Sequence, residues 1–216
     1  MSEPASIRYL NPGAMWGRTG PRPPGGPVVA TNAPLPKKWG STQTVYLNDG
    51  KGQGNNIAVF PTFVQGICAQ LDLWRTKPAY RNQKFKNAIV VWSGGNNVPS
   101  YIAYVMARVP GMTPDTVMND AFWKGPMGIG FLRAQAGHEA GKQYPAPAED
   151  WMEAQRRVFE VAAKEASTAK KQAGGVVAGG VVATTVAQHF DVSTPIIIAM
   201  VLVVAAVAIA IWRSKK

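Results

Sequence analysis

Glu139 is the residue whose type and position best suit acid–base chemistry in this chain. It follows an apolar run that is expected to be helical and precedes Ala140-Gly141, with Tyr144 shortly after. A carboxyl group at the C-terminal end of a helix, beside apolar and aromatic neighbours, is suited to general acid catalysis. The alternative is a solvated helix-end carboxylate that pairs with Lys142 or Arg133.

Few other carboxylates precede residue 146, so few residues could serve as a second catalytic carboxylate. Asp49, Asp72, Asp115 and Asp120 are available, but none stands in a recognisable catalytic motif. Most glycosidases need two carboxylates, spaced for acid and for nucleophile or base. A lytic transglycosylase uses one Glu and lets the 6-hydroxyl of the sugar attack in place of water. The scarcity of acids therefore favours a single-carboxylate mechanism.

Aromatic residues near the predicted loops and helix ends are candidates to stack on the faces of sugar rings. Trp16, Tyr101 and Tyr144 are the ones expected to bind substrate. Core packing is the commoner role for a tyrosine such as Tyr101. Together with Glu139, these rings favour a carbohydrate-binding site.

The charge balance points to a polyanionic partner. The chain has 216 residues and a formal net charge of +11, which favours nucleic acid, anionic lipid or an acidic cell-wall polymer without choosing among them. Cys68 is the only cysteine, which excludes an intrachain disulfide and a thiolate metal cluster. His138 and His189 are too few for a zinc site built on histidine. We therefore predict neither a metal site nor a cofactor.

Residues 1–163 are predicted to form a mainly helical, α+β soluble domain with a small β element. Residues 21–43 are rich in Pro and Gly and are expected to form an irregular surface excursion. Two β-prone pieces, 44–47 and 57–60, are expected to pair around a Gly-rich loop. Helices are expected from the capping residue Thr62 onward and over 85–92, 99–109, 113–122, 127–138 and 149–171.

The C-terminal residues 195–212 carry no charge and are almost wholly aliphatic. At about 1.5 Å per residue, a helix of this length covers roughly 27 Å, close to the hydrocarbon thickness of a bilayer. Trp212 and the basic tail 213–216 then fit a membrane interface. The pattern predicts a transmembrane helix, and the alternative is a buried core helix.

The connecting residues 164–194 allow two interpretations. A basic helix end is followed by a Gly/Val-rich segment, 173–187, in which Gly-Gly-Val-Val-Ala is nearly repeated. Gly175 and Gly179 have the spacing that lets membrane helices approach closely, which favours the first leg of a hairpin. A flexible linker is the alternative. The hairpin would place both basic flanks on the cytoplasmic side of the membrane.

Four motifs, taken in order, resemble a family of phage virion proteins. They are Ile7-Arg8-x-x-Asn11-Pro12-Gly13, Phe60-x-Thr62-x-x-x-Gly66-Ile67-x-Ala69, Trp92 with Asn96-Asn97 and Tyr101-Ile102-x-x-Val105, and Ala134 to His138-Glu139-x-Gly141. The resemblance implies a lysozyme-like fold, Glu139 as the catalytic residue, and Asn11, Asn96 and Asn97 as substrate-binding residues. The family usually reads Asn-Asn-Pro-Gly-Asn, and here Leu10 and Ala14 replace the outer asparagines.

The leading hypothesis is a membrane-anchored peptidoglycan glycosidase, a lytic transglycosylase or muramidase, which a phage uses in cell-wall penetration or lysis. It predicts peptidoglycan, a lipid membrane and other virion proteins as partners. The expected location is an internal virion membrane or the host inner membrane. One alternative is a non-catalytic virion protein that contacts DNA through its phosphates. Another is a hole-forming membrane protein. No motif indicates sequence-specific recognition of nucleic acid.

Overall fold

The computed structural model describes residues 3–47 and 56–175, with side chains described as far as residue 170. The chain divides into two compact units, Met1–Lys164 and Glu165–Lys216, and residues 165–175 are the described part of the second. The elements in chain order are α1 (Ala5–Arg8), β1 (Val28–Ala30), α2 (Pro34–Lys38), β2 (Gln43–Tyr46), β3 (Asn56–Val59), α3 (Phe63–Thr76), α4 (Phe85–Trp92), α5 (Val98–Met106), α6 (Asp120–Lys124), α7 (Pro126–Ala140) and α8 (Ala148–Gly175).

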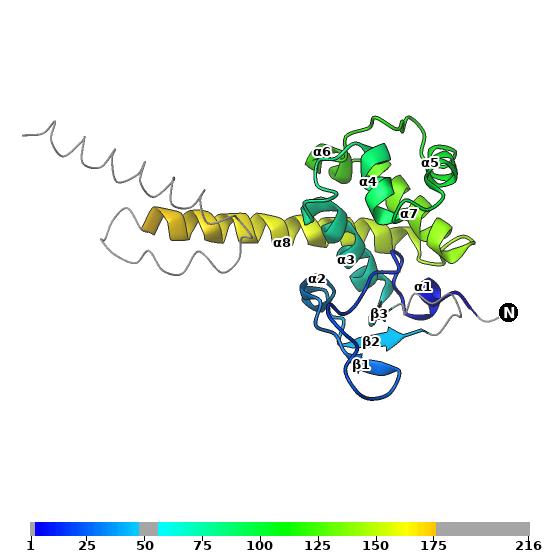
Figure 1. Ribbon diagram of the computed structural model, residues 1–216. Helices are drawn as coiled ribbons and strands as arrows, with labels where there is room; N and C mark the ends of the chain where they lie inside the picture. Colours follow the sequence, from blue (N-terminus) through cyan, green and yellow to red (C-terminus); the bar gives the residue numbers. More distant parts are fainter. Residues whose placement is uncertain (1–2, 48–55, 176–216) are drawn as a thin grey trace, which may run out of the picture. The chain divides into compact units, whose positions relative to one another are not determined.

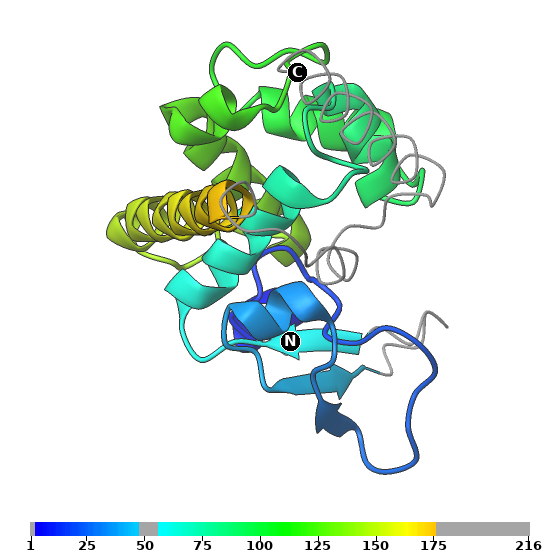
Figure 2. The ribbon, with the colours of Figure 1, turned by 90° about the vertical axis from the view of Figure 1, so that its left-hand side faces the viewer.

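Helix α3 lies at the centre of the first unit. The small sheet lies on one side of it and helices α4, α5 and α6 lie on the other, in both views of the ribbon (Figures 1 and 2). The main core joins α3 to α4, α5, α7 and the first part of α8. Its largest fully buried side chains include Trp74, Trp123 and Trp151. Burial of such rings is a large part of what holds the helices together.

The sheet has the antiparallel order β1-β2-β3. Strands β2 and β3 confirm the two predicted β-prone pieces, with Val45 opposite Ile57. Strand β1 and helix α2 fall within residues 21–43, which were expected to be irregular. Val28 pairs with Val45, so the neighbouring strand supplies the hydrogen bonds that order β1. The other side of β3 is covered by the N-terminal segment, where Ala58 N donates to Met15 O.

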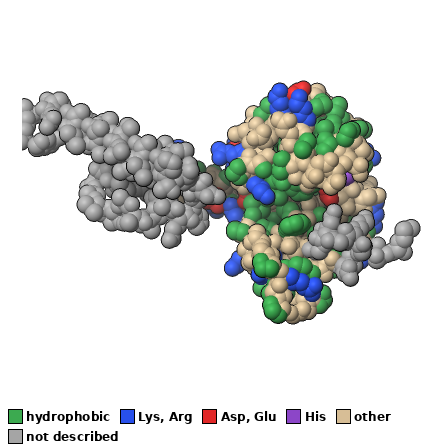
Figure 3. Space-filling view, in the orientation of Figure 1, with side chains coloured by type: hydrophobic (Ala, Val, Ile, Leu, Met, Phe, Trp, Pro, Cys, Tyr) green, Lys and Arg blue, Asp and Glu red, His purple; other side chains and the backbone are tan. Residues whose placement is uncertain are grey.

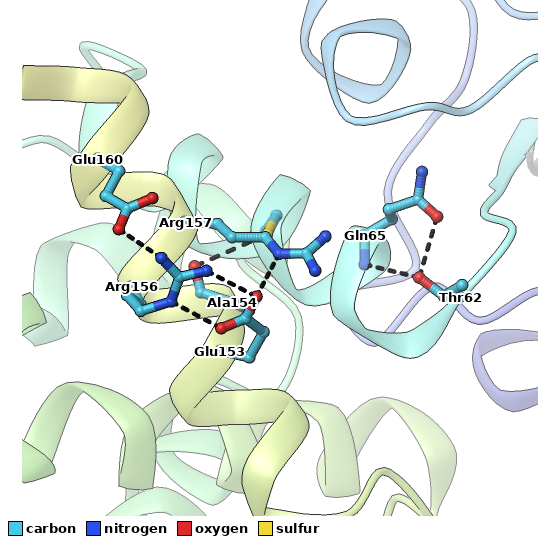
Figure 4. Close-up of polar contacts among 8 residues, drawn as sticks. Thr62, Gln65, Glu153, Ala154, Arg156, Arg157 and Glu160 are labelled. Carbon is cyan, nitrogen blue, oxygen red and sulfur yellow. Dashed lines mark hydrogen bonds and ion pairs between the residues drawn. The ribbon is translucent and has the colours of Figure 1, made fainter. Parts of the chain in front are cut away.

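Helix α3 begins as its sequence predicts. The Thr62 hydroxyl oxygen accepts a hydrogen bond from Gln65 N at 3.2 Å, which satisfies one of the free amides of the first turn (Figure 4). The sequence predicts an apolar face of Phe63, Ile67, Leu71 and Trp74. The last three of these are fully buried, and Phe63 is partly buried. Helix α4 has the predicted bounds, 85–92.

The predicted helix over 113–122 is wrong at its start. Thr113 N donates to the Thr116 hydroxyl at 2.9 Å and forms a turn, so Thr113-Pro114-Asp115 does not begin a helix. Helix α6 starts later because Asn119 caps it, accepting from Phe122 N at 3.0 Å. Thr113 and Asn119 are both of a residue type that can cap a helix, and the local sequence does not show which of them does so.

The predicted fold class also included a C-terminal transmembrane helix, and this part is wrong. No helix within residues 3–47 and 56–175 is long and apolar enough to cross a bilayer. The longest, α8, carries charged side chains such as Glu160 and Lys164, which are costly to place in hydrocarbon. The residues on which the prediction rested, 195–212, lie outside the described residues. The structure supports a helical domain with a small sheet.

The structure describes only part of residues 164–194. The sequence allows a linker or the first leg of a hairpin in this segment. Residues 164–175 continue α8 as a helix, and 176–194 lie outside the described residues. On the earlier part of α8, Glu153 binds Arg156 at 2.8 Å and Arg157 at 2.6 Å (Figure 4). These contacts and the Arg156–Glu160 pair tie successive turns of the helix together.

The Asn-Pro-Gly turn near the N-terminus carries two strained residues. Leu10 has φ of 52° and Ala14 has φ of 47°, both in the left-handed region. Asparagine and glycine enter this region at a lower energetic cost than leucine or alanine. Both residues therefore carry backbone strain that a residue tolerant of this region would relieve.

Replacing Ala14 with Gly is therefore expected to stabilise the protein by about 1 kcal/mol, because Gly adopts a left-handed φ without strain. Gly also increases the entropy of the unfolded chain, which offsets part of the gain. Urea denaturation should show a higher midpoint with an unchanged slope. A lower midpoint would contradict the strain.

Candidate functional site

Glu139 lies in the last turn of α7, and its side chain is partly buried. The helix ends immediately after it, because Gly141 takes a left-handed conformation with φ of 64°. Two donors from other helices meet at one carboxylate oxygen. Trp92 Nε1 and Tyr101 Oη each donate to Glu139 Oε1 at 3.0 Å. The second oxygen, Oε2, has no hydrogen-bond partner among the described residues.

Trp92 packs against Trp74 and against the N-terminal turn. Its ring stacks on the fully buried Trp74, with centroids 4.8 Å apart. On the N-terminal side, a Cβ added at Gly13 would lie 3.2 Å from Trp92 Cη2, so the Asn-Pro-Gly turn contacts this ring. The turn therefore helps to position Trp92, which donates a hydrogen bond to Glu139, although the turn and Trp92 are far apart in sequence.

Tyr101 is buried between α5 and α7. Its ring lies on the His138 ring at a centroid distance of 3.8 Å. Burial and the neighbouring charge of Glu139 raise the pKa of the Tyr101 phenol well above its usual value. The phenol is therefore neutral at physiological pH and donates a hydrogen bond to Glu139 throughout that range.

A buried pair of amides lies behind these donors. Gln135, one helical turn before Glu139, accepts from Gln70 Nε2 at 2.6 Å and from Trp74 Nε1 at 2.8 Å. Gln135 Nε2 itself has no hydrogen-bond partner among the described residues. Neither Gln70 nor Gln135 was expected from the sequence to support the site, although the spacing of Gln135 and Glu139 places these two residues on one face of a helix.

Replacing Tyr101 with Phe is expected to lower the free energy of unfolding by about 1.5 kcal/mol. The variant keeps the ring on His138 and loses one hydrogen bond to a carboxylate, whose loss costs roughly that much. The matched control is Tyr9→Phe, which removes a hydroxyl outside the site. Urea denaturation measures both. Equal effects of the two substitutions would contradict the contribution of the hydrogen bond from Tyr101.

The other predicted substrate-binding residues fall into two groups. Trp16 is 60% exposed and lies beside β3, bridged to Ile57. Asn96 and Asn97 are exposed in the turn before α5, and Asn97 has a left-handed φ of 47°. These three side chains are accessible to a ligand. Tyr101, as described above, reaches Glu139 from a buried position.

Asn11 and Tyr144 are buried and hold the fold together. Asn11 Nδ2 donates to Met15 O and to Ala58 O, both at 2.9 Å, and Asn11 Oδ1 accepts from Met15 N. The Tyr144 hydroxyl donates to Ser6 O at 3.2 Å. Burial raises the pKa of Tyr144 far above its usual value. The polar groups of both side chains bond to the protein backbone in this structure.

The remaining candidate carboxylates are engaged elsewhere. Asp72 is buried and accepts from Trp39 Nε1 at 2.9 Å, with Lys38 Nζ at 3.0 Å, so it joins α2 to α3. The ion pairs of Asp115 are with Lys84 and Lys86, and that of Asp120 is with Arg75. Asp49 lies outside the described residues. In the part of the chain that the structure describes, no group of three or more His, Cys, Asp or Glu could hold a metal ion.

Comparison with known proteins adds no identification: no protein-family model and no curated protein matches this chain. The chemistry of the site is therefore argued from its geometry. A partly buried carboxyl group with one oxygen fixed and one oxygen unbonded is suited to proton transfer at a bound polar group. Hydrophobic side chains gather on the hollowed face between the helical and sheet parts (Figure 3), which suits a ligand with apolar ring faces.

Proposed function

We propose that this protein is a glycosidase that cleaves peptidoglycan, of lytic transglycosylase or muramidase type, with Glu139 as its acid–base residue. The observation that carries the proposal is the fixed carboxyl group. Trp92 and Tyr101 both bond to Oε1, which orients the side chain and leaves Oε2 to carry the proton.

One carboxyl group is enough for the transglycosylase reaction. Glu139 Oε2 gives its proton to the glycosidic oxygen as the bond from that oxygen to C1 breaks, and C1 becomes oxocarbenium-like. The carboxylate then takes the proton of the sugar's own 6-hydroxyl. The hydroxyl oxygen bonds to C1 and forms a 1,6-anhydro ring, so the glycan is cut without consumption of water and Glu139 regains its proton.

Two further features support this substrate class. The exposed ring of Trp16 is of the kind that stacks on sugars. The net charge of +11 attracts an anionic polymer and raises the rate of encounter. A muramidase would need a second carboxylate, and the described carboxylates Asp72, Asp115 and Asp120 pair with basic residues elsewhere. The single-carboxylate reaction is therefore the favoured form.

The test is digestion of purified Gram-negative sacculi by the full chain, followed by mass spectrometry of the products. Anhydro-muramyl ends are expected, since they arise when the 6-hydroxyl attacks C1. Reducing muramyl ends would show attack by water and would assign the muramidase reaction instead. If the pure protein releases no muropeptides, the enzyme proposal fails and a structural role in a virion becomes the better account.

A further inference from the structure

A hollow lies next to His138, the residue before Glu139 in α7. It has a volume of about 820 Å³ and lies between α5, α7, the segment after α7 and the start of α8. Four of its lining side chains are basic: Arg108, Arg133, His138 and Lys142. No Asp or Glu lines it. A concave surface with one sign of charge concentrates the electrostatic field and attracts the opposite charge.

The basic side chains of this hollow have no carboxylate partner among the described residues. Lys84 and Lys86, by contrast, both form ion pairs with Asp115. No ion pair within residues 3–47 and 56–170 involves Arg108, Arg133 or Lys142. Arg108, Arg133 and Lys142 are exposed to solvent, so their cationic groups are accessible to an anionic ligand.

Arg108 is also held in a fixed position. Its guanidinium carbon lies 3.5 Å from the centroid of the Tyr104 ring, and Nη1 donates to Tyr104 O at 3.1 Å. Stacking leaves the edge of a guanidinium free to donate two parallel hydrogen bonds, the geometry that suits a carboxylate. The side chain is therefore oriented before any ligand binds.

The hollow is connected to the catalytic residue by a short series of ring contacts. Tyr104 meets His138 edge to face, with centroids 5.0 Å apart. His138 lies on Tyr101, whose hydroxyl donates to Glu139. His138, which lines the hollow, is therefore linked to Glu139 through Tyr101.

We propose that this hollow binds carboxylate groups of the stem peptide that muramic acid carries in peptidoglycan. The inference rests on the proposed function, which makes a peptide-bearing glycan the ligand at Glu139, the residue that follows the hollow-lining His138. The enzyme would then act on peptide-bearing strands in preference to bare glycan. A phosphate group has similar charge and also fits an arginine fork, and the experiment separates the two ligands.

The experiment compares Arg133→Gln with Arg81→Gln in the full chain. Arg81 is exposed and lies outside the hollow, so it controls for the loss of one positive charge. The substrates are glycan strands with intact stem peptides and the same strands stripped of peptides by an amidase. Arg133→Gln is expected to raise KM about tenfold on the peptide-bearing strands and to leave KM on the stripped strands unchanged. Arg81→Gln should affect both substrates equally.

An equal change on both substrates, or no change on either, would overturn the inference. Calorimetric titration of the full chain, first with a free stem tetrapeptide and then with inorganic phosphate, gives a readout that does not depend on cleavage. Binding of the tetrapeptide that weakens about tenfold in Arg133→Gln supports the hollow even if no glycan is cut, in which case the proposed function alone fails. Binding of phosphate without binding of the tetrapeptide would overturn the assignment to carboxylates.

Discussion

Replacing Glu139 with Gln is expected to lower the rate of glycan cleavage at least about a hundredfold, because general acid–base catalysis contributes about 10² to 10⁴ in rate. Gln has nearly the same shape as Glu and cannot transfer a proton at this position. Its amide oxygen still accepts from Trp92 Nε1 and Tyr101 Oη, so these donors are not left unpaired. The measurement is the initial rate of muropeptide release from sacculi.

The matched control is Glu149→Gln, the same chemical change in the first turn of α8. Glu149 is exposed, and the hydrogen bonds of Glu139 come from Trp92 and Tyr101. The rate of the Glu149→Gln variant should therefore stay close to that of the wild type. The thermal midpoint of Glu139→Gln should also stay near the wild-type value, which separates lost chemistry from lost folding. A Glu139→Gln enzyme with a third or more of the wild-type rate would show that Glu139 is not the acid.

Replacing Gly66 with Ala is expected to destabilise the fold by about 3 kcal/mol or more, since overpacking against atoms that cannot move is costly. A Cβ at this position would lie 1.9 Å from the Leu10 carbonyl oxygen and 3.0 Å from Pro12 Cδ. The carbonyl oxygen belongs to backbone, so the N-terminal turn would have to move away from α3. The change in the free energy of unfolding is measured by urea denaturation.

Gly26→Ala is the control for this substitution. A Cβ at Gly26 meets no atom within 4 Å, and the residue does not need a left-handed φ. Its stability should change by less than about 0.5 kcal/mol. Because the displaced turn supports Trp92, Gly66→Ala should also lower activity in conditions where the protein remains folded. Equal stability changes in the two variants would contradict the close approach at Gly66.

The elements that the sequence predicted well are those whose signals are local. The cap at Thr62, the apolar face of α3 and the bounds of α4 follow from side-chain spacing and from helix-end chemistry within a few residues. The pairing of β2 with β3 likewise follows from two β-prone pieces on either side of a short Gly-rich segment.

The features of the fold that the sequence did not predict depend on contacts between residues that are distant in the chain. Strand β1 forms because Val28 pairs with Val45 in the neighbouring strand. The Pro- and Gly-rich sequence around Val28 does not predict this pairing. The late start of α6 depends on which of two capping sites the surrounding structure favours. The need for glycine at Gly66 depends on a carbonyl group that lies far away in sequence, at Leu10.

The sequence by itself determined that Glu139 lies at the end of a helix near aromatic residues, because helix termination at Gly141 is a local property. Only the tertiary structure brought Trp92 and Tyr101 to one oxygen of that carboxylate, from 47 and 38 residues away. It also decided that Asn11 and Tyr144 bond to backbone and that four basic side chains share one hollow. The reason is physical: residue type sets what a side chain can donate or accept, and packing of distant helices sets which partner it meets.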